Sequence, residues 1–186
     1  ELVAHVYDIT YGSIKESDNL VVIDDSIVRG TTLQKSILKI LDRLNPKKII
    51  IVSSAPQIRY PDCYGIDMAR MEDFIAFRAA LGLIKEKKNN LLEQTYKDCI
   101  NELKLPDIKM ENKVKAIYEN FSDDEISQKI AQILKEKTIK SDINVIFQTV
   151  ENLHKSCPKN LGDWYFTGDY PTAGGNRVVN LSLIHI

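Results

Sequence analysis

Few cysteines, no excess of either charge and no long apolar run characterise this sequence of 186 residues. Its three cysteines, Cys63, Cys99 and Cys157, are widely spaced and form no Cys-x-x-Cys pair, which is typical of reduced thiols in a reducing compartment. Lysine and arginine number 25 against 26 aspartates and glutamates, so the net charge of −1 favours neither a nucleic acid nor a membrane surface. No apolar run approaches the roughly 18 residues of a membrane span, and no signal-peptide pattern is visible. We therefore expect a cytoplasmic protein without a nucleic-acid or membrane partner.

The periodicity of the apolar residues predicts an α/β fold. A chain of this length can form one domain that buries about 70% of its unfolded surface. Continuous apolar runs predict buried parallel strands at 20–23 and 48–54, and a last short strand is expected at 144–148. Apolar residues at helical spacing, with stop and start signals, predict helices at 33–44, 71–84, 92–103, 123–134 and 150–155. Residues 2–11 fit either a helix or a strand.

Two of the expected helices carry further signals. Ser122 and Glu125 have the spacing of a capping box, and the acids Asp123 and Asp124 between them suit the first turn of a helix. The helix at 92–103 carries an apolar stripe that is expected to pack in the core or at an interface, formed by Leu92, Tyr96, Cys99, Ile100 and Leu103.

The segment 20–32, LVVIDDSIVRGTT, is the most informative part of the sequence. A strand pattern ends in two adjacent carboxylates, Asp24 and Asp25, and the turn Gly30-Thr31-Thr32 then leads into a helix pattern. Ligands of open α/β sheets bind at the carboxyl ends of strands, and the unpaired amides at a helix start favour an anion such as phosphate. This layout is therefore that of a ribose-phosphate site.

Each part of the segment suits a separate task. Gly30 can adopt backbone angles that are closed to other residues, and Thr31 and Thr32 add hydroxyls that can cap the helix. Asp24 and Asp25 suit the two hydroxyls of a ribose, or a Mg²⁺ ion that bridges to a pyrophosphate. Because strand residues alternate between faces, we expect the two carboxylates to diverge. Taken singly, such a pair or such a turn is more often an exposed strand end or a plain helix cap.

Residues 24–32, DDSIVRGTT, resemble the phosphoribosyl pyrophosphate signature of type I phosphoribosyltransferases, in the form found in the amidophosphoribosyltransferase family. Two further stretches match that family: SSAPQIRYP at 53–61 with YGIDM at 64–68, and FTGDYPT at 166–172. Three motifs in the same order make chance agreement a poor explanation.

The resemblance implies the parallel-sheet fold of type I phosphoribosyltransferases, present in part, with an added helical section at about 85–119. It implies that Asp24 and Asp25 are the catalytic residues, which hold the ribose hydroxyls and Mg²⁺. The residues implied to surround the substrate's 5′-phosphate are Ser26, Arg29, Gly30, Thr31 and Thr32. The side chain of Arg29 can instead point to solvent or to a subunit contact. Arg59 and Tyr60 either line the site or anchor their loop.

The reaction of this family transfers ammonia, released from glutamine by a glutaminase domain, to C1 of phosphoribosyl pyrophosphate. The products are 5-phosphoribosylamine and pyrophosphate, in the first step of de novo purine nucleotide biosynthesis. The implied partners are phosphoribosyl pyrophosphate and ammonia from the glutaminase domain, and a homo-oligomer is expected. Two alternatives stay open: another phosphoribosyl pyrophosphate enzyme, such as a pyrophosphokinase or a salvage transferase, and a regulator that senses phosphoribosyl pyrophosphate without turnover.

The domain expected from the resemblance is a partial phosphoribosyltransferase domain over residues 1–180. The family's glutaminase domain uses an N-terminal cysteine as nucleophile, and no cysteine precedes Cys63. We therefore expect that the glutaminase domain is absent and that the chain alone is inactive. Residues 181–186, LSLIHI, break the family pattern and are expected to be a non-native tail, with a genuine apolar tail as the alternative.

Some members of this family hold an iron–sulfur cluster through cysteines near the third motif. A cluster needs about four thiolates. The stretch 160–165 contains no cysteine, and three scattered thiols do not form such a set. We therefore expect Mg²⁺ as the cofactor and no iron–sulfur cluster.

Overall fold

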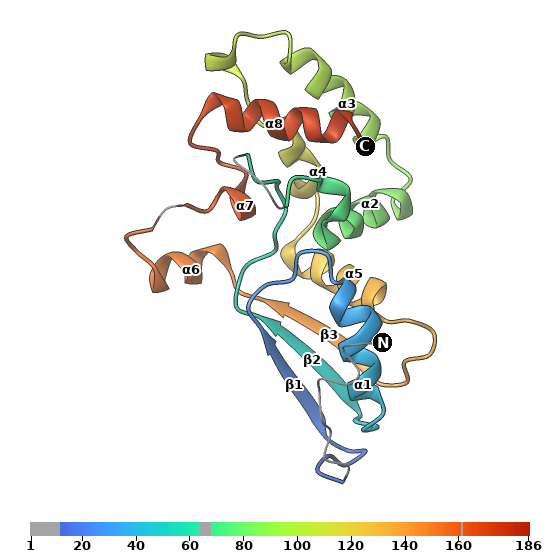
Figure 1. Ribbon diagram of the computed structural model, residues 1–186. Coiled ribbons are helices and arrows are strands. Elements are labelled where there is room, and N and C mark those ends of the chain that lie inside the picture. The colour runs from blue at the N-terminus through green and yellow to red at the C-terminus, as the bar shows by residue number, and fades with distance from the viewer. Residues whose placement is uncertain (1–11, 64–67, 161) are drawn as a thin grey trace.

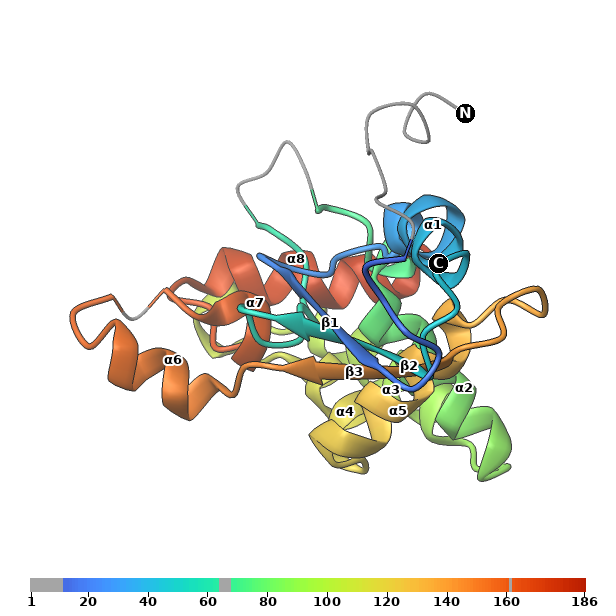
Figure 2. The same cartoon turned by 90° about the horizontal axis from the view of Figure 1, so that it is seen from below.

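The computed structural model describes residues 12–63, 68–160 and 162–186. Its described residues contain one parallel three-stranded sheet, with most of the helices lying beyond one end of the strands (Figures 1 and 2). The strands are β1 (Asn19–Asp24), β2 (Lys48–Ser53) and β3 (Asp142–Phe147), in the order β1-β2-β3. The α/β class, the parallel sheet and all three expected strands are thus confirmed. The element expected at 2–11 lies outside the described residues.

Helices connect and cover the strands. In chain order the helical elements are η2 (Leu33–Ile37, a π-helix), α1 (Leu38–Asp42), η3 (Met71–Asp73), α2 (Ile75–Glu86), α3 (Leu91–Glu102), η4 (Asp107–Lys109), η5 (Lys113–Lys115), α4 (Ala116–Glu119), α5 (Asp123–Leu134), α6 (Val150–Ser156), α7 (Trp164–Thr167) and α8 (Ala173–Ile184). Ser122 and Glu125 form the expected capping box at the start of α5. The helix expected at 71–84 is interrupted, because Phe74 is extended between η3 and α2.

One face of the sheet forms the core, and α1 and α5 lie on this side. Ile49 and Ile51 of β2 are fully buried there. α5 contacts β3, and its end meets η2, where the side-chain amide of Gln34 donates to the carbonyl of Ile133 at 2.7 Å.

The other face of the sheet is largely uncovered by the described residues. Ile23 in β1 is 77% exposed, and Val21 and Ile146 are also exposed. The expectation that β1 is a buried strand is therefore wrong for this structure. β1 pairs only with β2, and no described element packs over its outer face, so its apolar run remains half in solvent.

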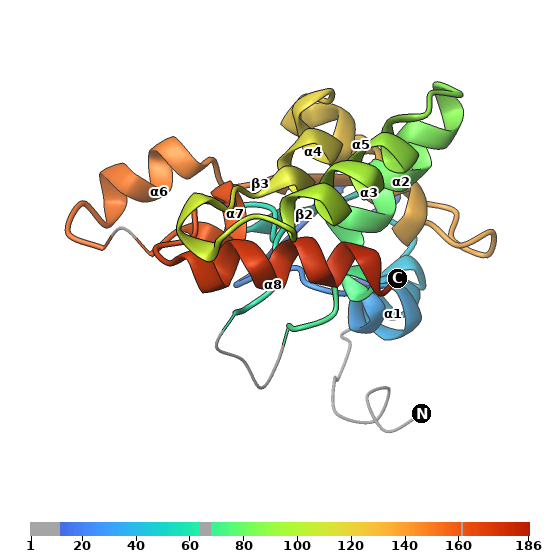
Figure 3. The same cartoon turned by 90° about the horizontal axis from the view of Figure 1, so that it is seen from above.

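A second group of helices lies beyond the carboxyl ends of the strands (Figures 1 and 3). α3 and α8 run side by side in both views, and α3 also contacts η5 and α4. Residues 85–119 form an added helical section, as expected, and they pack against α2, which precedes them in the sequence, and against α8, which lies near the end of the chain. They therefore share one core with the rest of the described chain.

The apolar stripe expected on α3 is only partly buried. Cys99 is fully buried, whereas Leu92, Tyr96 and Ile100 are exposed. The buried face also includes the polar residues Thr95 and Glu102. Leu92, Tyr96 and Ile100 therefore do not pack in the core of this chain, and packing at an interface with another chain stays a prediction for them.

The last residues of the chain continue α8. The helix extends to Ile184, and Leu183 is 4% exposed within the core. Residues 181–184 thus form the last turn of α8. Among the described residues, no helix has the length and apolar character that crossing a membrane requires.

Candidate ligand site at the carboxyl end of β1

An open cleft of about 450 Å³ lies where β1 ends and the helical run 31–42 begins. Its lining residues are Asp24, Ser26, Ile27, Val28, Arg29, Gly30, Thr31, Thr32, Leu33 and Ile37. Six of the seven residues proposed from the sequence thus surround one cleft. Asp25 is the exception: it does not line the cleft, and its side chain is exposed.

The two carboxylates follow one another at the strand end. Asp24 is the last residue of β1, and its Oδ1 accepts a hydrogen bond from the N–H of Asp25 at 3.0 Å. The Oδ1 of Asp25 in turn accepts the N–H of Ser26 at 2.7 Å. Partial burial raises the pKa of Asp24, and the neighbouring Asp25 carboxylate raises it further. A cation at this point would therefore relieve an unfavourable concentration of negative charge.

The backbone around the acids is fixed by β2. The N–H of Ser54 donates to the carbonyl of Asp24 at 2.9 Å, and the N–H of Ala55 donates to that of Asp25 at 3.0 Å. The hydroxyl of Ser54 also lies within hydrogen-bond distance of both carbonyls, at 3.2 and 3.1 Å. These bonds continue the β1–β2 ladder past the end of the strands and hold the acids at the rim of the cleft.

The donor set suits a magnesium ion that arrives with its ligand. In the described part of the chain, no three His, Cys, Asp or Glu side chains are grouped as a metal site. Mg²⁺ is commonly held by one or two carboxylates together with substrate phosphates and several waters. Asp24 and Asp25 fit that pattern, because they supply two carboxylates at an open rim with space for phosphate oxygens.

Gly30 makes the turn between strand and helix possible. Its φ of +69° is in the left-handed region, and a Cβ at this position would lie 2.6 Å from Cδ1 of Ile75 and 3.0 Å from Cδ2 of Leu134. Its carbonyl accepts the N–H of Gln34 at 2.9 Å, which is the first bond of the helical run. Both the conformation and the packing therefore favour glycine here.

The threonines that follow present polar groups to the cleft. Thr31 and Thr32 are exposed, and Thr32 already has helical angles without a side-chain capping bond. The expected capping role is therefore wrong for Thr32. The first amides of a helix have no acceptor within it, so this turn offers N–H groups and hydroxyls together to an anion.

The residues that contact this turn from η3 and α2 were not predicted from the sequence. The Nε of Arg29 lies 3.3 Å from Oδ2 of Asp73, so its side chain pairs with η3. The Arg29 carbonyl accepts a hydrogen bond from Nη2 of Arg78 at 2.7 Å, and the Val28 carbonyl accepts the N–H of Ile75 at 2.8 Å. No motif marks these partners, because they lie more than forty residues further along the chain.

The loop after β2 is anchored through Arg59 and Tyr60. The N–H groups of both residues donate to the carbonyl of Tyr165, at 2.8 and 3.1 Å. The guanidinium of Arg59 pairs with Asp123 at the start of α5, and the Tyr118 hydroxyl donates to the Arg59 carbonyl at 2.7 Å. Of the two roles left open for Arg59 and Tyr60, these contacts support anchoring.

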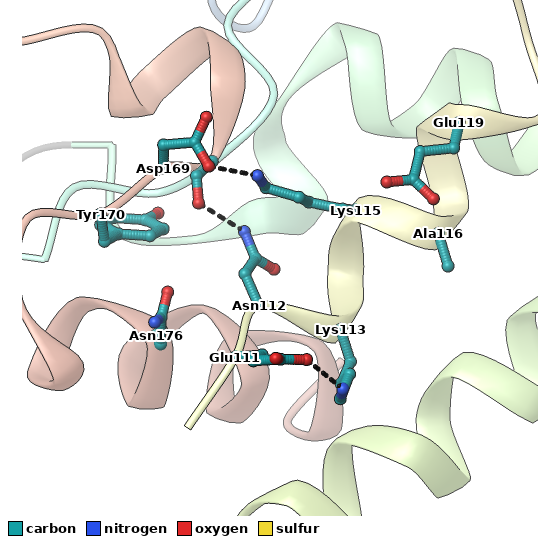
Figure 4. A pocket seen from close by; sticks show the side chains of 10 residues that line it. Glu111, Asn112, Lys113, Lys115, Ala116, Glu119, Asp169, Tyr170 and Asn176 are labelled. Atoms are coloured by element: carbon teal, nitrogen blue, oxygen red, sulfur yellow. Dashed lines mark hydrogen bonds and ion pairs between the residues drawn. The ribbon is translucent and has the colours of Figure 1, made fainter. Parts of the chain in front are cut away.

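The third motif, at 166–172, lies beside a different cleft of about 490 Å³, between η5, α4 and the start of α8 (Figure 4). Asn112 donates to the carbonyl of Gly168 at 3.1 Å, and Lys115 pairs with Asp169 (Figure 4). Gly168 has a φ of +72°, and a Cβ there would lie 2.8 Å from the ring of Tyr60. This motif therefore joins helices and contributes no lining residue to the cleft at β1.

The three cysteines are free thiols in separate places. Cys63 is half-buried, Cys157 is exposed, and Cys99 is buried against Asn180, whose Oδ1 lies 3.4 Å from its sulfur. Burial raises the pKa of Cys99 to about 12. A thiol in that state is inert rather than nucleophilic.

The chain is similar to curated amidophosphoribosyltransferases, although no family model matches it. The protein of that name from Haemophilus influenzae is 48% identical over 59 residues, which are 32% of this chain and 12% of the relative. The Escherichia coli protein is 36% identical over 94 residues, 48% of this chain and 18% of the relative. The Schizosaccharomyces pombe protein is 34% identical over 85 residues, which are 45% of this chain and 16% of the relative. The chain thus spans less than a fifth of the length of these relatives.

Proposed function

Because the chain is similar in sequence to amidophosphoribosyltransferases, we propose that its cleft at the end of β1 binds phosphoribosyl pyrophosphate in an enzyme of that activity. Ammonia derived from glutamine is transferred to C1 of the ribose, and pyrophosphate leaves, giving 5-phosphoribosylamine for purine nucleotide biosynthesis. The observation that supports this most is that the Asp24 carboxylate, with Asp25 next to it in the chain, lines the same cleft as the turn Gly30-Thr31-Thr32.

In this proposal the 5′-phosphate binds at the start of the helical run. The amides of Gly30, Thr31 and Thr32 and the hydroxyls of Ser26 and the two threonines surround it. A helix terminus by itself contributes only about 0.3–2 kcal/mol to anion binding, so several of these donors must act together. The glycine lets the phosphate approach the main chain without a side chain between them.

Asp24 and Asp25 act on the other end of the ligand. They accept hydrogen bonds from the ribose hydroxyls and face the shell of the metal ion. When Mg²⁺ is bound, it neutralises charge on the departing pyrophosphate. The transition state has oxocarbenium character, so catalysis consists mainly of holding C1 in line with ammonia and of stabilising positive charge near the carboxylates.

The remaining parts of the activity are also proposals. The relatives are several times longer than the stretches they share with this chain, so we expect the 186 residues alone to show no glutamine-dependent transfer. Ammonia would come from a glutaminase domain, and the protein would work as a cytoplasmic homo-oligomer.

The test is an assay of the full protein with phosphoribosyl pyrophosphate, Mg²⁺ and either glutamine or ammonium salt. The proposal predicts release of pyrophosphate that depends on the nitrogen donor. Product formation that requires a purine base would indicate a salvage transferase instead. Synthesis from ribose 5-phosphate and ATP would indicate a pyrophosphokinase, and calorimetric binding without any turnover would indicate a sensor.

A further inference from the structure

The start of α2 donates hydrogen bonds to the backbone of the turn at the candidate phosphate site. The N–H of Ile75, the first residue of α2, donates to the carbonyl of Val28 at 2.8 Å. One turn later on the same helix, Nη2 of Arg78 donates to the carbonyl of Arg29 at 2.7 Å. Two successive carbonyls of the turn are thus directed toward α2.

These bonds also fix the direction of the amides. In a trans peptide the N–H points opposite to the C=O of the same peptide group, and the described residues contain no cis peptide bond. The Arg29 carbonyl and the Gly30 N–H belong to one such group, so the guanidinium of Arg78 makes the Gly30 N–H point away from α2. The Gly30 carbonyl accepts the N–H of Gln34 at 2.9 Å, so the N–H of Thr31, in the same peptide group, points away from the helical run.

The amides that result are available to a ligand. Within the described ranges, neither the N–H of Gly30 nor that of Thr31 has a protein acceptor. Both residues line the cleft, whereas Ile75 and Arg78 do not. Successive amides directed to one side form a concave seat for an anion.

Arg78 acts on the turn differently from the nearby ion pair, although both interactions are exposed. The pair between Arg29 and Asp73 joins two side chains. The charge-assisted bond from Arg78 is instead accepted by a backbone carbonyl of the turn, so it acts directly on the orientation of that peptide group.

We propose that Arg78 is a positioning residue for the 5′-phosphate site: it orients the Arg29–Gly30 peptide so that the Gly30 amide faces the phosphate. This inference rests on the proposed function, because it assigns a task at the same cleft. It adds a residue that lies outside the motif and does not touch the ligand.

The experiment uses the full protein with Arg78→Ala, Arg78→Lys and the control Arg70→Ala. Arg70 is a matched control because it lies in the same region, is exposed and pairs with Glu72 rather than with the turn. Two probes are titrated by calorimetry: ribose 5-phosphate, which needs the phosphate seat, and magnesium pyrophosphate, which needs only the carboxylate end. Thermal unfolding of each variant is recorded in parallel.

The inference predicts that Arg78→Ala weakens the binding of ribose 5-phosphate about tenfold. A loss of this size is expected when one hydrogen bond to a charged group is removed. Magnesium pyrophosphate should bind as before, Arg78→Lys should recover part of the loss, and Arg70→Ala should bind both probes normally. Unchanged affinity of Arg78→Ala for ribose 5-phosphate, or equal weakening of both probes, would overturn it. If the unaltered protein binds neither probe, the proposed function itself fails, and that outcome is distinct.

Discussion

Oδ1 of Asn180, a fully buried side chain in α8, accepts a hydrogen bond from the backbone N–H of Lys113 at 3.1 Å. Its Nδ2 donates to the carbonyl of Glu111 at 2.8 Å, and the sulfur of Cys99 lies 3.4 Å from Oδ1. One amide side chain therefore joins α8 to α3 and to the segment before α4. This contact ties the helical section at 85–119 to the last helix of the chain.

Replacing Asn180 by alanine should lower the free energy of unfolding by about 2–4 kcal/mol, because two backbone groups lose their partner inside the core. Urea unfolding, monitored by circular dichroism, measures this change in the free energy of unfolding. The matched control is Asn176→Ala, which loses a single bond to the carbonyl of Met110 and should cost about 1 kcal/mol. Equal, small losses for both variants would show that Asn180 is not the anchor described here.

Asp42 predicts a pH-dependent contribution to stability. Partial burial raises its pKa, but hydrogen bonds from Ser141 and Lys140 outweigh burial, so the pKa is lowered overall. A lowered pKa means that the stabilisation is present above the pKa of the unfolded chain, about 3.9, and is lost as the pH falls through the folded value. Asp42→Asn should therefore cost about 1–2 kcal/mol at pH 7 and progressively less below about pH 4. Urea unfolding of both proteins across this range tests the prediction, and a difference independent of pH would contradict it.

Gly30→Ala should weaken the fold and the site together. An alanine at a φ of +69° costs about 1–2 kcal/mol, and its Cβ would also push Ile75 aside. We expect a lower midpoint of thermal unfolding and weaker binding of ribose 5-phosphate. The control is Gly174→Ala in α8, where a Cβ meets nothing closer than 3.9 Å. That variant should raise the free energy of unfolding by about 0.5–1 kcal/mol. If Gly174→Ala instead lowers stability as much as Gly30→Ala does, the positive φ of Gly30 is not the reason for its effect.

Local patterns were enough to predict the three strands and the helices α2, α3, α5 and α6, but not the helix α8. The apolar run before Asp24 gives β1, and the spacing of Ser122 and Glu125 gives the start of α5. Glycine at position 30 indicates a backbone conformation that is closed to other residues, and the structure places Gly30 at a φ of +69°. These features depend on neighbours within a few residues, which is why the sequence reveals them.

Features that depend on distant partners could not be predicted in the same way. Arg78 and Asp73 contact the turn from 49 and 44 residues away, with no motif of their own. The exposure of Ile23 depends on what packs over β1, and a continuous apolar run is the same in an edge strand and in a central one. The contact of Cys99 in α3 with the buried Asn180 of α8 joins residues 81 positions apart, and hydrophobic periodicity does not detect such a polar partner.

Asp24→Asn combined with Asp25→Asn should abolish transfer in the full protein, with a loss of at least 100-fold, because the carboxylates stabilise charge that develops at C1. Hydrolysis of glutamine, which does not use this cleft, should remain measurable. The control replaces Asp123 and Asp124, an adjacent pair of acids in the first turn of α5, by asparagine. Near-normal synthesis by the first variant would defeat the assignment of Asp24 and Asp25.

The most direct measurement is a crystal structure of the full protein soaked with phosphoribosyl pyrophosphate and Mg²⁺. The account predicts density in the cleft at the end of β1, with phosphate oxygens on the amides of Gly30 and Thr31 and ribose hydroxyls at Asp24 or Asp25. Ligand density elsewhere, for example beside Asn112 and Asp169, or a turn whose amides bond back to the chain, would contradict it.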